Sequence, residues 1–465
     1  DESKFGIFIH WGVFSVPAWG FGPGQGDAGS AEWFWWWWQG SNKKPEYEEF
    51  VRKTEHENFA YADYAHRFDA SLYRPEEWAN LFAQSGAQYV VFTAKHHEGF
   101  CNWDSKEAVP LSWNWNAMDV GPRRDLVAEL SKAVKSTKSP TTGQPLHWGL
   151  YHSLKEWFNP LYVQDTANDY NTRRFVEEKI MPELYDLVNK YEPELIWSDG
   201  DDGVDDKRDK YWNAPEFLAW YATNSTVADT AIWNDRWGTT CKHGAFFTCH
   251  DRYQPGKLVD KKWENALTPD PHSWAYNRRT NGTQYLSVEY FVHELIETVA
   301  FGGNMLLNVG PAADGTIPAI FWDRLLGIGD WLKVNGEAIY KTKPWKVAQN
   351  QTDVGAYYTT KGGTLYALVT KWPKDNRLVL AAPIPTADTQ VRMVGLDTDE
   401  GYLAWDYMAP SKESGSEAGI VIEVPSLTPD VIPCQHAWVF AIRGLQNEYK
   451  GGKDLDLIRV GQYTN

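Results

Sequence analysis

The stretch Leu195-Ile-Trp197-Ser-Asp199-Gly200 is a short apolar run that ends in a carboxylate and a glycine. Four other runs also end in side chains suited to chemistry: they are Phe5-Gly-Ile-Phe-Ile-His10-Trp11, Tyr89-Val-Val-Phe-Thr-Ala-Lys95-His96-His97-Glu98, Leu146-His-Trp-Gly-Leu-Tyr151-His152 and Ile232-Trp-Asn234-Asp235-Arg236-Trp237. Short runs that are apolar on both sides are typical of strands in a parallel sheet covered by helices. In a (β/α)₈ barrel, residues at the carboxyl ends of the strands build the active site. The pattern therefore predicts an enzyme built on a barrel.

The remaining sequence predicts two domains. Helical periodicity occurs at 74–82, 124–135, 176–187 (with a kink at Pro182), 288–301 and 318–334, and one more strand is expected at 305–310. This alternation indicates a parallel α/β architecture. After Pro344 the chain has short β-type runs separated by turn residues, at 356–360, 364–371, 377–381, 390–394, 419–424 and 437–442. We expect a (β/α)₈-like barrel in residues 1–340, an antiparallel β-sandwich in 341–446 and a tail in 447–465.

The composition limits the partners that the protein can bind. Acidic residues outnumber basic ones by 62 to 45, which gives a formal charge of −17 and argues against binding nucleic acid or an anionic membrane. No apolar stretch approaches the ~20 residues that a membrane-spanning helix needs. The 26 tryptophans offer apolar faces with one N–H donor each, which suit sugars, although most are expected to fill cores.

The cysteines and glycosylation motifs indicate the compartment. Cys241 and Cys249 are close enough in sequence to close a small disulfide loop, and sequons for N-glycosylation occur at Asn224, Asn281 and Asn350. These features favour a protein that is secreted or lysosomal.

Asp199 is the first candidate for chemistry. It follows a strand of buried type and precedes Gly200, where the backbone can turn sharply. A carboxylate at the end of a barrel strand, beside Trp197, is placed to act as a nucleophile on an electrophilic carbon. The alternative interpretation is structural, with Asp199 capping the next turn or helix.

Arg236 ends the following strand. There it can clamp substrate hydroxyls or hold a carboxylate ionised, because a nearby cation favours the charged form. For Asp235 we favour a structural pair with Arg236.

The sequence His96-His97-Glu98 raises the question of a metal. Neighbouring strand residues point to opposite faces, and no third and fourth ligand follow at a recognised spacing, so we expect no metal. One of the two histidines is expected to face the pocket while the other orients a neighbour; His10 and His152 occupy similar positions at strand ends. No glycine pattern for a dinucleotide or phosphate is present, so no cofactor is expected.

A pocket rich in carboxylates and aromatic residues, without a cofactor motif, suits a retaining glycosidase. Such enzymes use one carboxylate as nucleophile and a second carboxyl, about 5–5.5 Å away, as acid and then base. The sequence identifies the first more readily than the second. Four candidates for the second are expected on a loop above the barrel, namely Asp251, Glu264, Asp270 and Glu289.

Several longer motifs occur together in the order typical of one family. They are Phe5-Gly-Ile-Phe-Ile-His10-Trp-Gly, Glu32-Trp33, Lys95-His-His-Glu-Gly-Phe100, Ser112-Trp-Asn-Trp-Asn116, Gly149-Leu-Tyr-His-Ser153, Met181-Pro-Glu-Leu-Tyr-Asp186, Leu195-Ile-Trp-Ser-Asp-Gly200, Asn234-Asp-Arg-Trp-Gly238 and Gly302-Gly-Asn-Met-Leu-Leu-Asn-Val-Gly-Pro311. On these motifs, from Lys4 to about Arg443, the chain resembles the α-L-fucosidases of glycoside hydrolase family 29, and among them the animal lysosomal type.

The resemblance implies a role for individual residues. Asp199 matches the family nucleophile. Positions that hold the fucose hydroxyls and ring are matched by His10, Glu32, Trp33, His96, His97, Tyr151 and Arg236. Trp274 matches an aromatic residue beside the sugar, and an apolar contact to the methyl group of fucose is expected near Trp197 and Trp274.

The acid/base residue is the place where the chain departs from the family. Bacterial relatives carry a glutamate where this chain has His250, and animal lysosomal enzymes carry Cys-Glu-Asp where it has Cys249-His250-Asp251. A histidine cannot be the carboxyl acid, so we expect Asp251 in this role, with Glu264 as the alternative.

The resulting hypothesis is a retaining exo-glycosidase that releases terminal α-L-fucose through a covalent fucosyl-Asp intermediate. Its expected partners are fucosylated oligosaccharides, glycoproteins or polysaccharides, and assembly into homo-oligomers is left open. The departure at His250 motivates a competing hypothesis, a catalytically inactive carbohydrate-binding protein on the same fold. A third hypothesis is a retaining glycosidase for another 6-deoxy or galacto-configured sugar.

Overall fold

The computed structural model describes residues 1–21, 29–112, 114–201, 210–238, 241–242, 244–396, 401–410 and 418–447. The chain divides into two compact units. The first comprises Asp1–Thr298 and Gly302–Lys333, and the second comprises Val299–Phe301 and Val334–Asn465. The expected tail after Asn447 lies outside the described residues.

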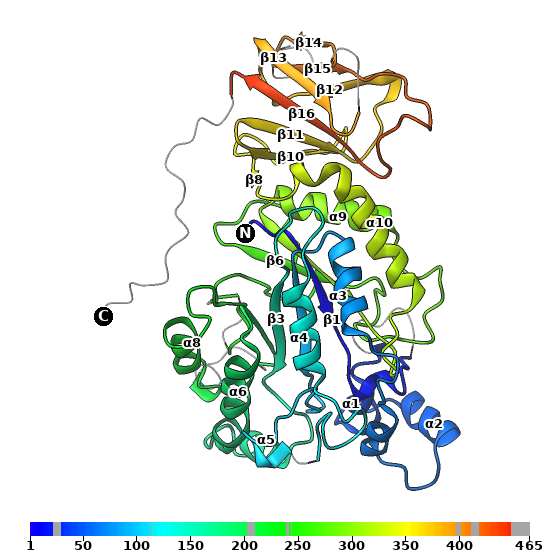
Figure 1. Ribbon diagram of the computed structural model, residues 1–465, viewed down its shortest axis with the longest axis vertical. Coiled ribbons are helices and arrows are strands. Elements are labelled where there is room, and N and C mark those ends of the chain that lie inside the picture. The colour runs from blue at the N-terminus through cyan, green and yellow to red at the C-terminus, as the bar shows by residue number, and fades with distance from the viewer. Residues whose placement is uncertain are drawn as a thin grey trace. The chain divides into compact units, whose positions relative to one another are not determined.

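The first unit is built on a curled parallel sheet (Figure 1). Its strands are β1 (Phe5–Ile9), β2 (Tyr89–Lys95), β3 (His147–Ser153), β4 (Leu195–Asp199), β5 (Ile232–Trp233), β6 (Trp263–Leu267) and β7 (Gly303–Val309), in the order β5-β4-β3-β2-β1-β7-β6. Most residues of β1 to β4 and β7 are buried, as expected for strands covered on both faces.

A short segment closes the gap between β5 and β6. Ala245 N donates to Trp233 O (3.0 Å), and Phe247 N donates to Lys262 O (2.8 Å). In return Phe247 O accepts from Glu264 N (2.9 Å). Residues 245–247 therefore take the place of an eighth strand and satisfy the backbone groups of both edges. The expected barrel fold is confirmed in this form.

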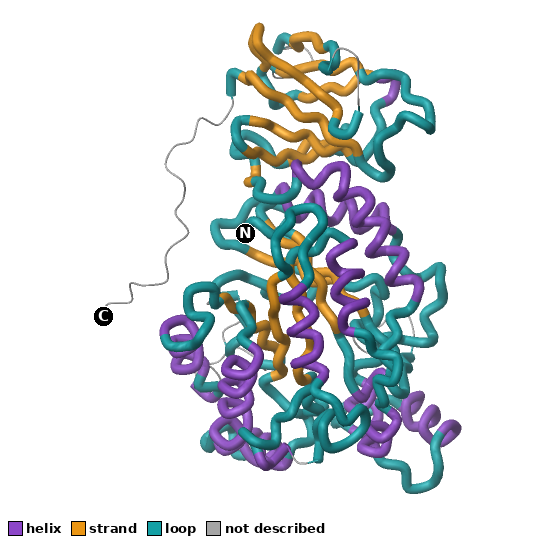
Figure 2. Tube along the Cα trace, viewed as in Figure 1, coloured by secondary structure: helices purple, strands orange, loops and turns teal. Residues whose placement is uncertain are grey.

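Helices connect the strands of the first unit (Figure 2). Five lie in or near the expected segments: α3 (Pro75–Gln84), α4 (Leu126–Ser136), α6 (Met181–Tyr191), α9 (Val288–Ala300) and α10 (Ala319–Asn335). Within the part of the chain that the structure describes, the helices that were not predicted are α1 (Phe34–Gln39), α2 (Pro45–Thr54), α5 (Pro160–Ala167) and α8 (Ala214–Thr223). A π-helical turn, Val176–Ile180, runs directly into α6, and Pro182 follows it, so that the wider turn accommodates the missing N–H of the proline inside one continuous helix. Short 3₁₀ turns occur at Val13–Ser15, Tyr61–Arg67, Pro110–Ser112, Gly336–Ala338 and Lys374–Asn376.

The second unit contains two antiparallel sheets. One has the order β13-β16-β11-β10-β8, with β9 also paired to β10, and the other has the order β12-β15-β14. The strands are β8 (Lys343–Pro344), β9 (Asn350–Gln351), β10 (Ala356–Lys361), β11 (Thr364–Val369), β12 (Arg377–Leu380), β13 (Pro385–Met393), β14 (Trp405–Met408), β15 (Gly419–Glu423) and β16 (Trp438–Leu445). Residues of both sheets, such as Leu378, Ile422 and Phe440, share one buried apolar core, so the expected sandwich is confirmed. Among the described helices, none combines the length and the apolar character needed to cross a bilayer.

Candidate active site

The carboxyl ends of the strands surround a cavity of about 560 Å³. It is lined by Phe8, His10, Trp33, His96, His97, Tyr151, Lys155, Trp197, Asp199, Gly200, Asp201, Arg236, Cys249, His250, Asp251, Arg252 and Trp274. All the expected site residues except Glu32 and Glu264 are in this set. Because parallel strands end at the same edge of the sheet, residues far apart in sequence meet here.

Asp199 is the last residue of β4 and faces the cavity beside Trp197. Residues two apart in a strand share a face, and Tyr151 on β3 is the register partner of Trp197, so the three side chains lie together. Tyr151 Oη donates to Asp199 Oδ2 at 2.9 Å. Gly200 follows with a positive φ of 71°, and a side chain there would approach Lys155 Cγ to 2.8 Å, so glycine is required for the turn.

Arg236 connects two carboxylates. Its Nη1 donates to Asp199 Oδ1 at 3.0 Å, and its Nη2 donates to Asp251 Oδ1 at 2.7 Å. The guanidinium also lies 4.6 Å from the centre of the Trp197 ring, a cation–π distance. These contacts bring together the two carboxylates that the sequence favoured as a catalytic pair.

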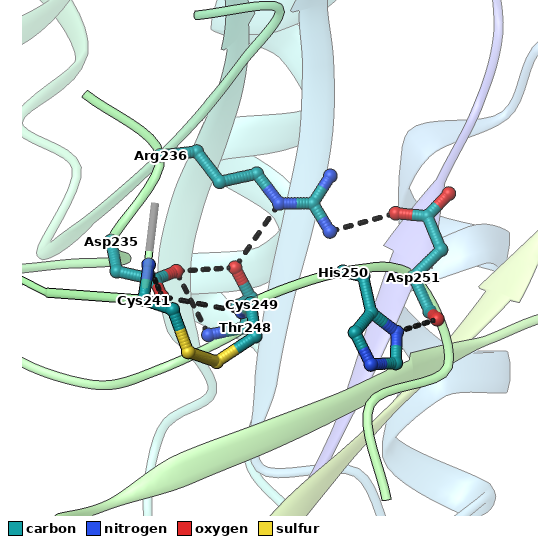
Figure 3. Close-up of a disulfide and its surroundings, with 7 residues drawn as sticks. All are labelled: Asp235, Arg236, Cys241, Thr248, Cys249, His250 and Asp251. Carbon is teal, nitrogen blue, oxygen red and sulfur yellow. Dashed lines mark hydrogen bonds and ion pairs between the residues drawn. A yellow bond between two sulfur atoms is a disulfide. The ribbon is translucent and has the colours of Figure 1, made fainter. Parts of the chain in front are cut away.

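Asp235 supports this arrangement indirectly, and the expected Asp235–Arg236 pair is wrong. Asp235 Oδ1 accepts from Thr248 N and Oγ1, and its Oδ2 accepts from the backbone N–H groups of Cys241 and Cys249 (Figure 3). Thr248 Oγ1 in turn accepts from Arg236 Nε at 3.2 Å. Arg236 and Asp235 are adjacent in sequence, but both lie past the end of β5 and make different contacts.

The predicted disulfide between Cys241 and Cys249 is present and closes this loop (Figure 3). Asp251 lies two residues after Cys249, so the disulfide and Asp235 together fix the start of the segment that carries Asp251. Asp235, Cys241 and Cys249 are spaced like metal ligands. They do not fit a metal, because the two sulfurs are bonded to each other and the carboxylate is already occupied by four donors.

The surroundings of Asp199 keep it ionised. Burial opposes the charged form, but the charge of Arg236, the proximity of His97 and the hydrogen bonds from Arg236 and Tyr151 outweigh it, and they lower the pKa of Asp199 well below its ordinary value. The carboxylate form is the one that a nucleophile needs.

His10 and His97, two of the histidines that line the cavity, are neutral. Burial, followed by the influence of His96, lowers the pKa of His10 to about 3, and the same two causes lower the pKa of His97 well below its ordinary value. A neutral imidazole has one N–H donor and one acceptor, so it can hydrogen-bond a hydroxyl in either direction. His10 Nδ1 is 2.8 Å from Asn308 Oδ1, and His97 Nδ1 is 2.6 Å from Ser153 Oγ. The Nε2 of His97 lies 3.6 Å from Asp199 Oδ2.

His96 and His97 both line the cavity, which differs from the expectation that only one would do so. The strand ends at Lys95, so the two histidines lie on the following turn, where the alternation of faces no longer holds. His152, by contrast, is buried below the cavity, and its Nε2 lies 3.0 Å from Glu183 Oε2.

Glu32 lies behind the cavity wall. It is 1% exposed, and its Oε2 accepts from Ser273 Oγ and from the backbone N–H groups of Trp274 and Ala275. Its Oε1 has no hydrogen-bond partner among the described residues. Burial raises the pKa of this carboxyl. Glu32 thus holds the Trp274 segment in place and keeps one acceptor unused.

Of the other candidate acids, only Asp270 lies on a loop at the carboxyl end of a strand, as the sequence had suggested, whereas Glu264 and Glu289 do not. Glu264 is 3% exposed and lies within β6. Asp270 is buried and accepts from Thr280 Oγ1 and His272 N, and Glu289 is in the first turn of α9. Of the four candidates, only Asp251 lines the cavity with Asp199.

Sequence reasoning missed several lining residues. Lys155, whose ammonium lies 5.7 Å from the Trp33 ring centre, and Arg252, whose guanidinium lies 5.3 Å from that of Trp274, place positive charge at the cavity. Asp201 also lines it, but its Oδ2 accepts from Gly238 N. Their position in the sequence could have identified two of them, because Lys155 and Asp201 each lie two residues past the end of a strand.

A barrel that holds two linked carboxyl groups, histidines and aromatic walls in one cavity is typical of a glycoside hydrolase. Residues 1–337 match the family model described as alpha-L-fucosidase, and residues 349–443 match that of the alpha-L-fucosidase C-terminal domain. The chain belongs to the α-L-fucosidase family.

Individual relatives agree with this assignment. The chain is 45% identical to tissue alpha-L-fucosidase of Homo sapiens over 448 residues, which cover 96% of this chain and 89% of the relative. It is 45% identical to plasma alpha-L-fucosidase of Rattus norvegicus, with 95% of this chain and 90% of the relative covered. Among solved structures, it resembles the Thermotoga maritima alpha-fucosidase in complex with a mechanism-based inhibitor, with a TM-score of 0.75, 31% identity and 95% of each chain covered.

Proposed function

We propose that this protein removes terminal α-L-fucosyl residues from glycans with retention of configuration, using Asp199 as nucleophile and Asp251 as acid and base. The bridging guanidinium of Arg236 carries this proposal. One side chain can bond both carboxylates only if they lie close together. Retention is supported by the similarity to an alpha-fucosidase that was solved with a mechanism-based inhibitor; retaining enzymes hold their two carboxyls about 5–5.5 Å apart.

In the first step, an oxygen of Asp199 forms a bond to the anomeric carbon of fucose while the glycosidic C–O bond breaks. The electron pair of that bond stays on the departing oxygen, which takes the proton that Asp251 carries on Oδ2, because Oδ1 accepts from Arg236. In the second step Asp251, now a carboxylate, takes a proton from water, and the resulting oxygen attacks the anomeric carbon and releases Asp199. Two inversions at one carbon give net retention.

Replacement of the nucleophile tests the core of the proposal. Asp199→Ala should lower kcat on an aryl α-L-fucoside on the order of 10⁴-fold. Azide should partly restore turnover, because the small anion can occupy the vacated space and attack the same carbon. Near-normal activity, or loss without rescue in a folded protein, would remove Asp199 from this role. If the wild-type protein binds fucose but turns over no aryl fucoside between pH 4 and 8, the inactive binding protein is the correct alternative.

Replacement of the acid tests Asp251. Asp251→Asn should slow fucosides with poor leaving groups by roughly 10²- to 10⁴-fold. Aryl fucosides with activated leaving groups should suffer much less, because they depart without protonation. Glu264→Gln is the matched control, and finding the leaving-group signature there instead would transfer the role to Glu264. A panel of aryl glycosides distinguishes fucose from other 6-deoxy or galacto-configured sugars.

The finer substrate class that we propose is a fucosylated oligosaccharide or glycoprotein glycan, and its support is the aromatic surface next to the cavity. Trp33, which lines the cavity, stacks on Trp37 at 5.9 Å and meets Trp36 edge-on at 6.5 Å. All three tryptophans remain partly exposed. Exposed indole faces suit the C–H faces of sugars, so the part of the glycan beyond fucose is placed on them.

Trp36→Ala tests this placement. We expect kcat/KM for a fucosylated oligosaccharide to fall roughly 10-fold, the value of about 1.4 kcal/mol of lost contact. The aryl fucoside has no further sugars, so its kinetics should stay within about 2-fold. Equal losses on both substrates would refute the placement. Light scattering on the same variant shows whether the tryptophans instead hold identical subunits together.

We place the protein in the lysosome or outside the cell. The similarity to tissue and plasma enzymes and the Cys241–Cys249 disulfide support this compartment. Asn224 and Asn281, two of the three sequon asparagines, are exposed and accessible for glycosylation. A change in apparent mass after treatment of the secreted protein with an N-glycanase tests this placement.

A further inference from the structure

Glu264 is a buried carboxylate at the opposite end of the barrel from the cavity that holds Asp199. It lines a second cavity of about 310 Å³. That cavity is also lined by residues at the starts of strands, including Tyr89, His147, Leu195, Ile232 and Trp263. Parallel strands all start at one edge, so the second cavity lies at the amino end of the sheet. Glu264 has no place in the two-step reaction proposed above.

The hydrogen bonds of Glu264 nevertheless lead to the reaction site. Its Oε1 accepts from Trp197 Nε1 at 2.9 Å, and its Oε2 accepts from Tyr89 Oη at 2.7 Å. Trp197 is 2% exposed and lines the cavity of Asp199. The Trp197 indole thus separates the two cavities, with its N–H bonded to Glu264.

Trp197 packs against both groups that hold the nucleophile. Its ring lies 5.7 Å from that of Tyr151, nearly parallel at 22°, and 4.6 Å from the guanidinium of Arg236. Tyr151 and Arg236 donate to the two oxygens of Asp199. A rotation of the Trp197 indole would displace its contacts with Tyr151 and Arg236. The hydrogen bond from the indole N–H to Glu264 opposes such a rotation.

We infer that Glu264 is a positioning residue for the fucosidase reaction, acting across the barrel through Trp197 to keep Tyr151 and Arg236 in contact with Asp199. The inference rests on Asp199 being the nucleophile. The positioning role requires only a hydrogen-bond acceptor for Trp197 Nε1 at the place of Oε1. Glutamine supplies the same acceptor, and its amide N–H can bond Tyr89 Oη as an acceptor.

The experiment compares Glu264→Leu, which removes the acceptor, with Glu264→Gln, which keeps it. Glu264→Leu leaves the indole N–H of Trp197 unpaired and should lower kcat roughly 10- to 100-fold, with KM changing less. The loss should be equal for good and poor leaving groups, because no proton donor has been removed. Glu264→Gln should retain activity within about 3-fold. Tyr89→Phe is the matched control, because it removes the bond to Oε2 and leaves Trp197 in place.

A double-mutant cycle with Trp197→Phe tests the route. Phenylalanine keeps an aromatic face but has no N–H, so Glu264→Leu should cost little further activity in that background. Additive losses would overturn the inference, as would wild-type kinetics in Glu264→Leu. Equal losses in the leucine and glutamine variants would overturn it too, because charge rather than the acceptor would then matter. If Asp199→Ala retains activity, the proposed function fails first. An additive cycle together with an inactive Asp199→Ala variant would refute the positioning role alone, so the failure of this inference can be distinguished from the failure of the proposed function.

Discussion

The two ends of the parallel sheet place carboxylates in contrasting surroundings. At the carboxyl end, Asp199 is in contact with the Arg236 guanidinium, and its pKa is lowered. At the amino end, Glu264 accepts from the neutral donors Tyr89 and Trp197, and burial, the largest cause, raises its pKa to about 7. Lys262 and Arg236 also favour the charged form of Glu264, but they do not outweigh burial.

The difference shows what decides the charge of an enclosed carboxyl. Both groups receive two hydrogen bonds from side chains, so the number of bonds does not separate them. A cation in direct contact outweighs the cost of desolvation, whereas neutral donors reduce it only in part. Asp199 is therefore held as an anion, the form that its proposed role as nucleophile needs, and Glu264 is suited to hold a neighbour in place.

The largest effect is expected from removing Arg236, the cation that distinguishes the surroundings of Asp199 from those of Glu264. Arg236→Met leaves Asp199 without its counter-charge, and loss of one preorganised donor at a reaction site lowers the rate roughly 10²- to 10³-fold. The pKa of Asp199 should rise, so the activity should disappear at a higher pH on the acid side. Rates on an aryl fucoside across pH measure both. Arg174→Met, which removes an exposed charge paired with Glu178, is the control, and an unchanged acid limb in Arg236→Met would contradict the explanation.

The raised pKa of Glu264 should be measurable in the pH dependence of the stability of the protein. The ordinary pKa of the glutamate is 4.5 and the folded value is about 7, so the folded state holds the proton more tightly. Its contribution to stability is complete below pH 4.5 and is lost as the pH rises toward 7 and beyond, by about 3 kcal/mol in total. Glutamine does not titrate. The free energy of unfolding of wild type minus that of Glu264→Gln should therefore fall by this amount between pH 4 and pH 8, measured with urea. A difference that is constant or rises with pH would show that Glu264 stays ionised.

The smallest effect is expected from removing one neutral hydrogen-bond donor to Asp199, which separates the contribution of such a donor from that of the cation. Tyr151→Phe deletes the donor to Asp199 Oδ2 and keeps the stacking on Trp197. A hydrogen bond to a charged acceptor is worth about 1.5–3 kcal/mol, so kcat/KM should fall roughly 10- to 100-fold. Tyr221→Phe is the matched control, since its buried hydroxyl donates to Pro193 O away from the cavity. Equal losses of activity in the two variants would mean that the effect is on folding alone.

Much of the carboxyl end of the barrel could be predicted from the sequence. The strand that ends in Asp199 and the one that ends at Lys95 are apolar runs long enough to identify, and a residue just past such a run lies at the rim of a barrel. The loop disulfide followed from the short spacing of Cys241 and Cys249. The exact faces of His96 and His97 could not be predicted, because strand alternation stops where the strand does.

The amino end was predicted poorly, and Glu264 shows why. The strand Trp263–Leu267 carries Glu264 and Asn265 in buried positions, so it lacks the apolar pattern that identifies a strand, and it was assigned to a loop. Its polar side chains are accommodated by partners far away in the chain, since Tyr89 is 175 residues from Glu264 and Trp197 is 67 residues away. Local sequence patterns do not identify partners that are so distant along the chain.

The sequence by itself determined the family and the order of strands and helices, and it singled out Asp199 as the candidate nucleophile, because these depend on local patterns and on motifs that occur in order. Only the tertiary structure decided which second carboxyl joins Asp199. Arg236 and Asp251 meet through the closure of the loop at Cys241–Cys249, whereas Glu264 is held on the far side of Trp197. The reason is that the distance between two carboxyls depends on how the strands are arranged around the barrel.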